Sequence, residues 1–141
     1  MNLFFDTSAL IKKYIIEEGS ENVDYLMNNA NMIFISVITE IETFSTFKRL
    51  LLENAITQKE YKILIKEFQI DYEYYSQIDF DSFISLNAKS MIEKYQLKSL
   101  DSIQLGTALS IKDEIDYFVV TDNKIIKSAK KEGFKILNPI V

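Results

Sequence analysis

Acidic side chains stand at positions from which they could act together on a bound cation. The candidates are Asp6, Asp101, Asp122 and either Glu40 or Glu42. Asp6 and Asp122 each follow an apolar run that is typical of a strand, and Asp101 lies near the expected start of a helix. Carboxylates that share one place repel one another unless a cation lies between them. The residue types and their positions therefore predict a divalent metal site.

Each of these acids also has a purely structural explanation. An aspartate between a strand and a helix, such as Asp6 or Asp122, is a good N-cap and stabilises the helix by about 1 kcal/mol. Asp101 lies in a first helical turn, where the helix dipole stabilises an acid by roughly 0.3 to 1 kcal/mol. In a parallel sheet, however, strand ends and the following helix starts meet at one edge. The acids together therefore indicate a site more strongly than any one of them does.

The composition restricts the chemistry of such a site. The chain contains no histidine and no cysteine. This excludes histidine general bases, Ser-His-Asp and Cys-His nucleophiles, disulfides and the His/Cys sites that zinc favours. Carboxylate and hydroxyl oxygens remain, and these hard ligands suit Mg²⁺ or Mn²⁺.

Short apolar runs alternate with helical patterns along the whole chain. The expected strands are 2–5, 32–35, 74–78, 117–120 and 134–137. The expected helices are 9–18, 20–29, 36–54, 57–68, 79 or 81 to 95, 99–112 and 122 or 123 to 133. Thr7 or Ser8 could cap the first helix, and Thr57 and Glu60 have the spacing of a capping box. This alternation predicts a single α/β domain over residues 1–141, with a central parallel sheet of four to five strands flanked by helices on both faces.

Size and hydropathy are those of an ordinary globular protein. The 141 residues are 48% hydrophobic and 26% charged, which is enough for one well-formed core. No apolar run reaches the roughly 18 to 20 residues of a spanning helix, and we recognise no signal peptide. We therefore expect a cytoplasmic protein without a membrane partner. The net charge of −5 is less expected for a protein that binds nucleic acid.

The acids lie in four short motifs. These are Asp6–Leu10 (Asp-Thr-Ser-Ala-Leu), Ser36–Glu42, Leu100–Ala108, and Phe118–Asp122 followed by Ala129, Gly133 and Asn138-Pro139. In this order they resemble the motifs of PIN domains, particularly those of VapC-like toxins. An acid follows a threonine by three positions in the second motif of that family. The resemblance therefore selects Glu42, three residues after Thr39, over Glu40, which helical periodicity alone leaves open.

The resemblance implies a metal-dependent endoribonuclease. Its catalytic and metal-binding residues would be Asp6, Glu42, Asp101 and Asp122, holding one or two Mg²⁺ or Mn²⁺ ions. Three hydroxyl groups could orient a ligand or a water, or could simply cap helices; they belong to Thr7, Ser8 and Thr121. The candidates for contacts with RNA phosphates are Lys12, Lys13, Lys48 and Arg49. Gln104 stands where relatives often carry histidine, and we expect it to pack beside the site.

The resemblance also implies partners, namely a small antitoxin protein and a second copy of the chain in a homodimer. The candidate elements for an antitoxin groove are the helices 23–29 and 37–52 and the tyrosines Tyr61, Tyr72, Tyr74 and Tyr75. A non-catalytic PIN-like module that keeps the acidic pocket is the main alternative. Phosphatases of the haloacid dehalogenase type are excluded, because they need a second aspartate where this chain has Ser8.

Overall fold

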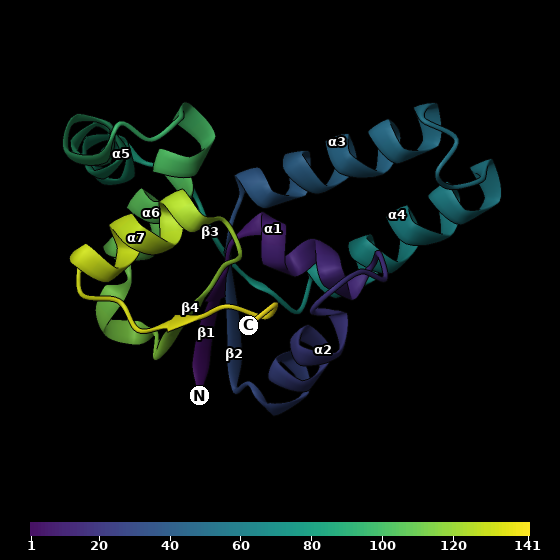
Figure 1. Ribbon diagram of the computed structural model, residues 1–141, viewed down its shortest axis with the longest axis horizontal. Coiled ribbons are helices and arrows are strands. Elements are labelled where there is room, and N and C mark those ends of the chain that lie inside the picture. The colour runs from purple at the N-terminus through teal and green to yellow at the C-terminus, as the bar shows by residue number, and fades with distance from the viewer.

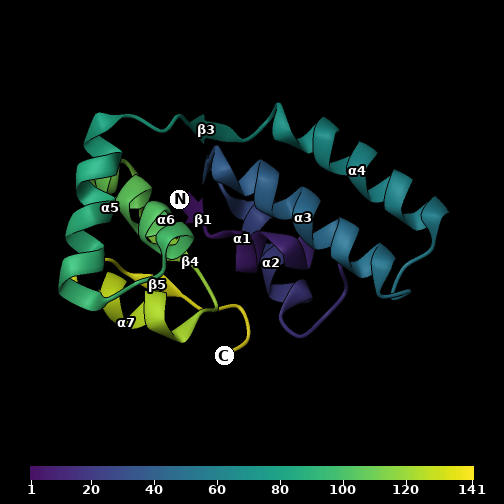
Figure 2. The same ribbon diagram turned by 90° about the horizontal axis from the view of Figure 1, so that it is seen from above.

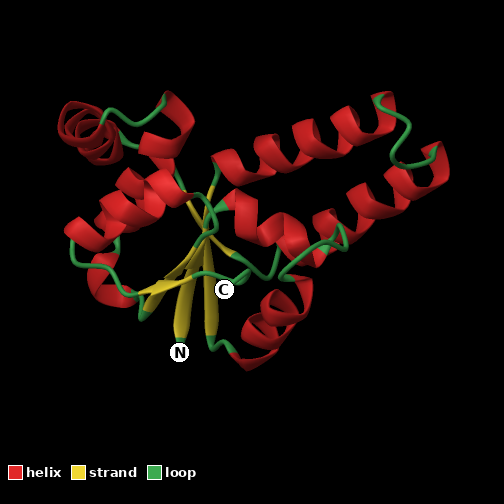
Figure 3. Cartoon of the chain, viewed as in Figure 1, coloured by secondary structure: helices red, strands yellow, loops and turns green.

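The protein folds as five parallel strands and seven α-helices, and the computed structural model describes all of residues 1–141 (Figures 1 and 3). The strands are β1 (Asn2–Phe5), β2 (Met32–Ser36), β3 (Ser76–Ile78), β4 (Tyr117–Val119) and β5 (Ile136–Leu137). The helices are α1 (Thr7–Leu10), α2 (Ser20–Asn29), α3 (Ile38–Leu52), α4 (Gln58–Tyr72), α5 (Ser82–Tyr95), α6 (Ser99–Ser110) and α7 (Asn123–Lys131), with short 3-10 helices η1 (Ile11–Lys13) and η2 (Lys112–Glu114). The predicted α/β fold is confirmed. No helix has the length and apolar character that crossing a membrane requires.

The sheet has the strand order β3-β2-β1-β4-β5, with every neighbouring pair parallel. β1 is central, so Leu3 lies opposite Ile33 of β2 on one side and Tyr117 of β4 on the other. The chain leaves β1 for β2 on one side and returns to β4 on the other. Such a reversal of strand order opens a crevice at the carboxyl ends of the strands.

Two hydrophobic cores cover the two faces of the sheet. Successive side chains of a strand point to opposite faces, and Leu3 and Phe5 accordingly belong to one core and Phe4 to the other. Helices α1 to α4 lie on the first face and α5 to α7 on the second, as both views show (Figures 1 and 2). All three of these strand side chains are fully buried. The sheet is therefore a wall between two separately packed halves.

The helix predicted for residues 9–18 is shorter in the structure. α1 and η1 end at Lys13, and the chain turns before α2 begins. The hydroxyl group of Ser20 explains the turn, because it accepts from Glu17 N at 2.9 Å and donates to the carbonyl of Ile15 at 3.3 Å. Gly19 has φ 92°, a left-handed conformation that glycine adopts without strain. These contacts replace the helical hydrogen bonds that the sequence pattern predicted.

The strand predicted for residues 74–78 begins only at Ser76. Tyr75 instead closes the end of α4, because its N–H donates to the carbonyl of Asp71 at 3.2 Å. Its ring is buried, and its hydroxyl is hydrogen-bonded to that of Tyr14 at 2.7 Å. The predicted strand is therefore confirmed for residues 76–78 but not for Tyr74 and Tyr75. The predicted capping box of Thr57 and Glu60 at the start of α4 is also confirmed.

Candidate active site

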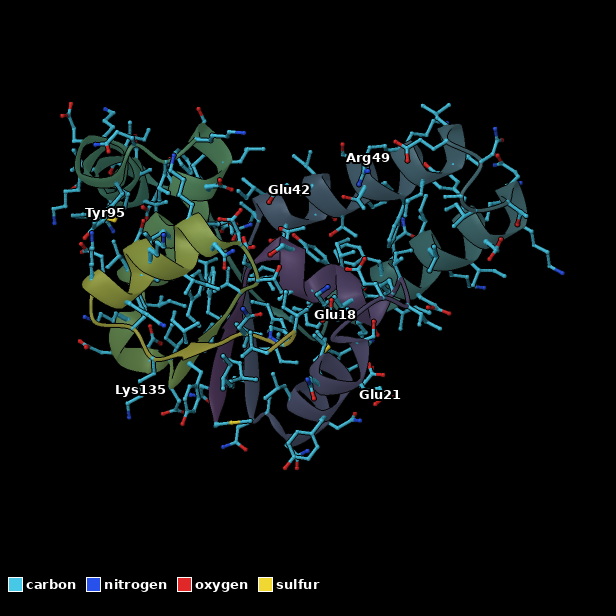
Figure 4. All side chains as sticks on the ribbon, viewed as in Figure 1. Glu18, Glu21, Glu42, Arg49, Tyr95 and Lys135 are labelled. Carbon is cyan, nitrogen blue, oxygen red and sulfur yellow. The ribbon has the colours of Figure 1, made fainter.

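The structure brings Asp6, Glu42, Asp101 and Asp122 into one cleft of about 610 Å³ at the carboxyl edge of the sheet. Asp6 directly follows β1, and its N–H donates to the carbonyl of Val119 at the end of β4, at 3.0 Å. Asp122 follows β4, and Asp101 lies in the first turn of α6. Glu42 comes from α3 and is seen on that helix in Figure 4. Glu40 does not line the cleft and instead lies near Tyr72.

Asp6 combines a structural role with a place in the site. It is the N-cap of α1, because its carboxylate accepts from Ser8 N at 3.3 Å and also from the Ser8 hydroxyl. Of the three caps that the sequence offered, Asp6 is thus the one that the structure uses, in place of Thr7 or Ser8. The pKa of Asp6 is raised to about 7, mainly by burial and in part by the negative charges of Glu42 and Asp101, while the hydrogen bonds from Ser8 act to lower it. A cation bound nearby would stabilise the ionised form of this carboxyl group.

Asp101 shows the same electrostatic coupling from the other side of the cleft. Burial is the main cause that raises its pKa, followed by the charges of Asp122 and Glu42. Lys98 and Lys124 act in the opposite direction without removing the shift. The four ion pairs of the protein all involve other acids. The four candidate acids therefore act on one another and are not neutralised by salt bridges.

A buried hydrogen-bond network fixes Glu42. Its Oε1 atom accepts from the Thr7 hydroxyl at 2.8 Å and from Gln104 Nε2 at 2.9 Å. Because the Thr7 proton is used there, Thr39 donates to Thr7 at 2.9 Å, and Gln104 supplies its second proton to Thr39 at 3.0 Å. The carboxylate can only accept, so the amide nitrogen of Gln104 must face it. Thr39 was not among the site residues expected from the sequence.

A shorter relay leads to Asp6. Thr121 Oγ1 donates to Ser8 Oγ at 3.1 Å, and Ser8 in turn donates to Asp6. Thr7, Ser8 and Thr121 thus all lie where they can orient the carboxylates. Thr7 and Ser8 act on Glu42 and Asp6 rather than on the end of α1.

Each carboxylate that the fold uses is used through one oxygen only. Asp6 accepts through Oδ2, Glu42 through Oε1, and Asp122 through Oδ1, to which Ile125 N donates at 2.9 Å. Asp101 accepts no hydrogen bond from the protein. No three acids are arranged so that they could hold a metal ion by themselves. Mg²⁺ is usually bound through one or two carboxylates together with waters and substrate phosphates, so these oxygen donors suit it.

The basic residues expected to contact RNA are divided by the fold. Lys12 and Arg49 line the cleft. Lys13 instead forms an ion pair with Asp71, and the Lys48 ammonium lies 5.5 Å from the centre of the Tyr61 ring. The structure therefore brings two of the four to the acids.

Solved structures with the same fold include a toxin and a toxin–antitoxin complex. A toxin–antitoxin complex from Klebsiella pneumoniae is 18% identical, with a TM-score of 0.70 and 97% of each chain covered. FitAcB from Neisseria gonorrhoeae is 15% identical, with a TM-score of 0.73 and again 97% of each chain covered. VapC20 from Mycobacterium tuberculosis, described as a sarcin-ricin loop cleaving toxin, is 12% identical over 94% of this chain and 96% of that one, with a TM-score of 0.66. At these identities the likeness shows the fold.

No curated protein sequence matches the chain. Among protein families, the PIN domain matches residues 3–132, a range that contains all four acids of the cleft. The match covers most of the 141 residues and agrees with the sheet order and the cleft described above. The chain therefore belongs to the PIN domain family.

Proposed function

We propose that this protein is a metal-dependent endoribonuclease and the toxin of a type II toxin–antitoxin pair. The observation that carries the proposal is the cleft in which Asp6, Glu42, Asp101 and Asp122 meet, each with at least one oxygen that the fold does not use. Membership of the PIN domain family supports a nuclease. The RNA-cleaving toxin and the toxin–antitoxin complexes among the similar structures support the assignment to RNA and to an antitoxin partner.

Asp6, Glu42, Asp101 and Asp122 would hold Mg²⁺ or Mn²⁺, some directly and some through water. A bound ion of this kind supplies a nucleophilic water at neutral pH and neutralises charge at the scissile phosphate. Thr7 and Gln104 both donate to Oε1 of Glu42 and so fix the orientation of its carboxylate group. Oε2 would then be available to the ion. Ser8 does the same for Asp6 through Oδ2. Asp6 would have to be ionised to hold the ion, and a cation beside it would lower the pKa of this carboxyl group from its raised value of about 7.

Cleavage of a total-RNA preparation tests the proposal. The wild type and Asp6→Asn are incubated with Mn²⁺, with Mg²⁺ or with a chelator, and Asp24→Asn, an exposed change on α2, serves as the matched control. We expect discrete products with metal for the wild type and the control, and none with chelator or with Asp6→Asn. Mapping the product ends then identifies the target. Equal cleavage by Asp6→Asn and the wild type would contradict the role of the cleft.

A non-catalytic PIN-like binding module is the second candidate. It is favoured by the net charge of −5 and by the lack of three converging acids. Such a module would bind metal and its partner while leaving RNA intact. Calorimetric titration with Mn²⁺, run beside the cleavage assay, separates the two functions.

An apolar groove next to the cleft suits the proposed antitoxin. The groove has a volume of about 340 Å³, and its lining includes Ile15, which also lines the cleft, with Ile16 and Ile63. The tyrosines expected to form such a groove do not line it, and Tyr75 is buried in the first core. An antitoxin segment with apolar side chains could fill the groove and place a basic side chain among the acids. Co-expression with the small protein of a neighbouring gene should relieve toxicity, and Ile63→Asp should prevent that relief.

The proposal also includes a homodimer and action in the cytoplasm, where RNA substrates are found. Sedimentation at several protein concentrations measures the oligomeric state. A monomer at all concentrations would contradict the homodimer without affecting the proposed cleavage.

A further inference from the structure

Lys12 is an unusual lysine because it is buried and yet lines the acidic cleft. Its side chain is 9% exposed, and its only hydrogen-bond partner is Glu17 Oε1 at 2.9 Å. An ammonium group is rarely buried unless it is paired. The only ion pair of Lys12 is with Glu17, and none of the four acids of the proposed metal site forms an ion pair. The charge of Lys12 is therefore directed at Glu17 and not at the proposed metal site.

The two partners of this pair differ in their freedom to move. Glu17 lies in the turn between η1 and α2, and its side chain is 42% exposed. The carboxylate can therefore rotate into water at little cost, whereas the buried stem of Lys12 keeps the ammonium in the cleft. Figure 4 marks this turn by Glu18, which lies across from the α3 residues Glu42 and Arg49. The Glu17 carboxylate can therefore move away from the pair, whereas the Lys12 ammonium stays in the cleft.

The wall of the cleft opposite this turn changes from acidic to basic along α3. Glu42 and Arg49 both line the cleft and are seven positions apart, which is about 10 Å along a helix. Arg49 has only one ion pair, to Glu53 at 3.9 Å, and both side chains are more than half exposed. Such a surface pair contributes little, so the guanidinium is available to a ligand. A polyanion that reaches the acids would find both cations beside them.

We propose that Lys12 binds an RNA backbone phosphate next to the one that is cut, and that Glu17 occupies Lys12 until RNA displaces it. This inference rests on the proposed ribonuclease function. A phosphodiester carries one negative charge and two accepting oxygens, as the Glu17 carboxylate does, so the exchange keeps the buried ammonium paired throughout. Glu17 then acts as an internal competitor of the substrate and lowers the affinity for weakly bound anions.

Binding of a short fluorescent single-stranded RNA tests this inference. All variants are made in the Asp6→Asn background with Mg²⁺, so that the RNA stays intact. We expect Lys12→Met to weaken binding about tenfold and to lower the slope of log K against log salt by about 0.7. Glu17→Gln should tighten binding several-fold, because the competitor is removed. The controls Lys89→Met and Glu93→Gln change exposed residues of α5 in the same way and should leave binding unchanged.

The outcomes separate this inference from the function on which it rests. If the background protein binds no RNA, the proposed nuclease function fails. If it binds RNA and neither variant changes the affinity, the role of Lys12 is wrong. If Lys12→Met and Glu17→Gln weaken binding equally and both lower the melting temperature, the pair is a structural brace and the inference is overturned. If Lys12→Met does not fold, Glu17→Gln is compared with Glu18→Gln, which removes a charge from the same turn without freeing a lysine. Tighter binding by Glu17→Gln than by Glu18→Gln supports competition, and equal tightening overturns it.

Discussion

Gln104 positions Glu42 in the structure, and it is neutral at every pH. Its amide nitrogen contacts Glu42, Thr7 and Thr39. Groups that orient metal ligands typically contribute 10- to 100-fold to metal affinity or activity. The sequence left open whether Gln104 packs beside the site or supports one of its ligands, and the hydrogen bond to Glu42 favours the second role.

Gln104→Leu should lower Mn²⁺ affinity and cleavage about 10- to 100-fold, because Glu42 loses one of its two donors. Calorimetric titration and the cleavage rate measure the effect. Thr43→Val is the matched control, since Thr43 is a buried neighbour whose hydroxyl has no partner. Removing that hydroxyl should be nearly neutral. Unchanged metal affinity in Gln104→Leu would show that the network serves packing alone.

The raised pKa of Asp6 predicts how stability depends on pH without metal. The folded protein holds this proton more tightly than the unfolded chain, so the contribution is favourable below about pH 4 and is lost as the pH rises through about 7. In chelator, Asp6→Asn should therefore be more stable than the wild type at pH 8, by about 2 to 4 kcal/mol. The difference should shrink towards pH 4, because Asp6 of the folded wild type is then protonated and neutral, as asparagine is. Asparagine also caps the helix equally well. Thermal unfolding across this pH range measures it.

Some residues of the site could be recognised in the sequence and others could not. Asp6 and Asp122 were recognisable because an acid after an apolar strand is a local pattern. Thr39 was not, because its contact with Gln104 joins positions 65 residues apart in the chain. The resemblance placed Gln104 beside the site but did not predict its hydrogen bonds. The pair of Lys12 and Glu17 was hidden for a further reason. The predicted helix would have carried both residues, whereas the turn after Lys13 brings them together.

At the scale of elements, the parallel sheet and its switch point follow from the alternation of strands and helices. Two of the differences from the predicted elements, at residues 14–18 and 74–75, involve side chains that join distant segments. Tyr14 and Tyr75 form a buried pair of hydroxyls, and Asp71 accepts from Tyr14 at 2.8 Å. Local propensity carries no information on such contacts, so it extended one helix too far and began one strand too early.

The contact between α5 and α6 depends on Gly106. A Cβ atom there would lie 2.9 Å from the backbone nitrogen of Ala88. Gly106→Ala should therefore push the helices apart and lower stability by about 1 to 3 kcal/mol, as measured by thermal or urea unfolding. Ser90→Ala on α5 adds no volume and should stay within about 0.5 kcal/mol of the wild type. A fully stable Gly106→Ala would mean that α5 is free to shift.

At the scale of the whole molecule, metal binding should be visible as a gain in stability. A ligand at a hundred times its Kd stabilises the folded state by about 2.7 kcal/mol. The melting temperature of the wild type should therefore rise with Mn²⁺ concentration and return to its starting value when chelator is added. Asp6→Asn should respond much less. An equal rise in both proteins would place the bound ion outside the cleft.

Because the sheet separates the two cores, the packing of each core should influence which metal ion the cleft prefers. Glu42 is carried by α3, which packs in the first core through Phe47, and Asp101 is carried by α6, which packs in the second through Leu105. The distance between Glu42 and Asp101 across the cleft therefore depends on the volume of the side chains packed in each core. Changes of volume deep in either half, such as Phe47→Leu, would alter the preference between ions of different radius. The ratio of the cleavage rates with Mg²⁺ and with Mn²⁺ would then depend on side chains that are fully buried, such as Phe47.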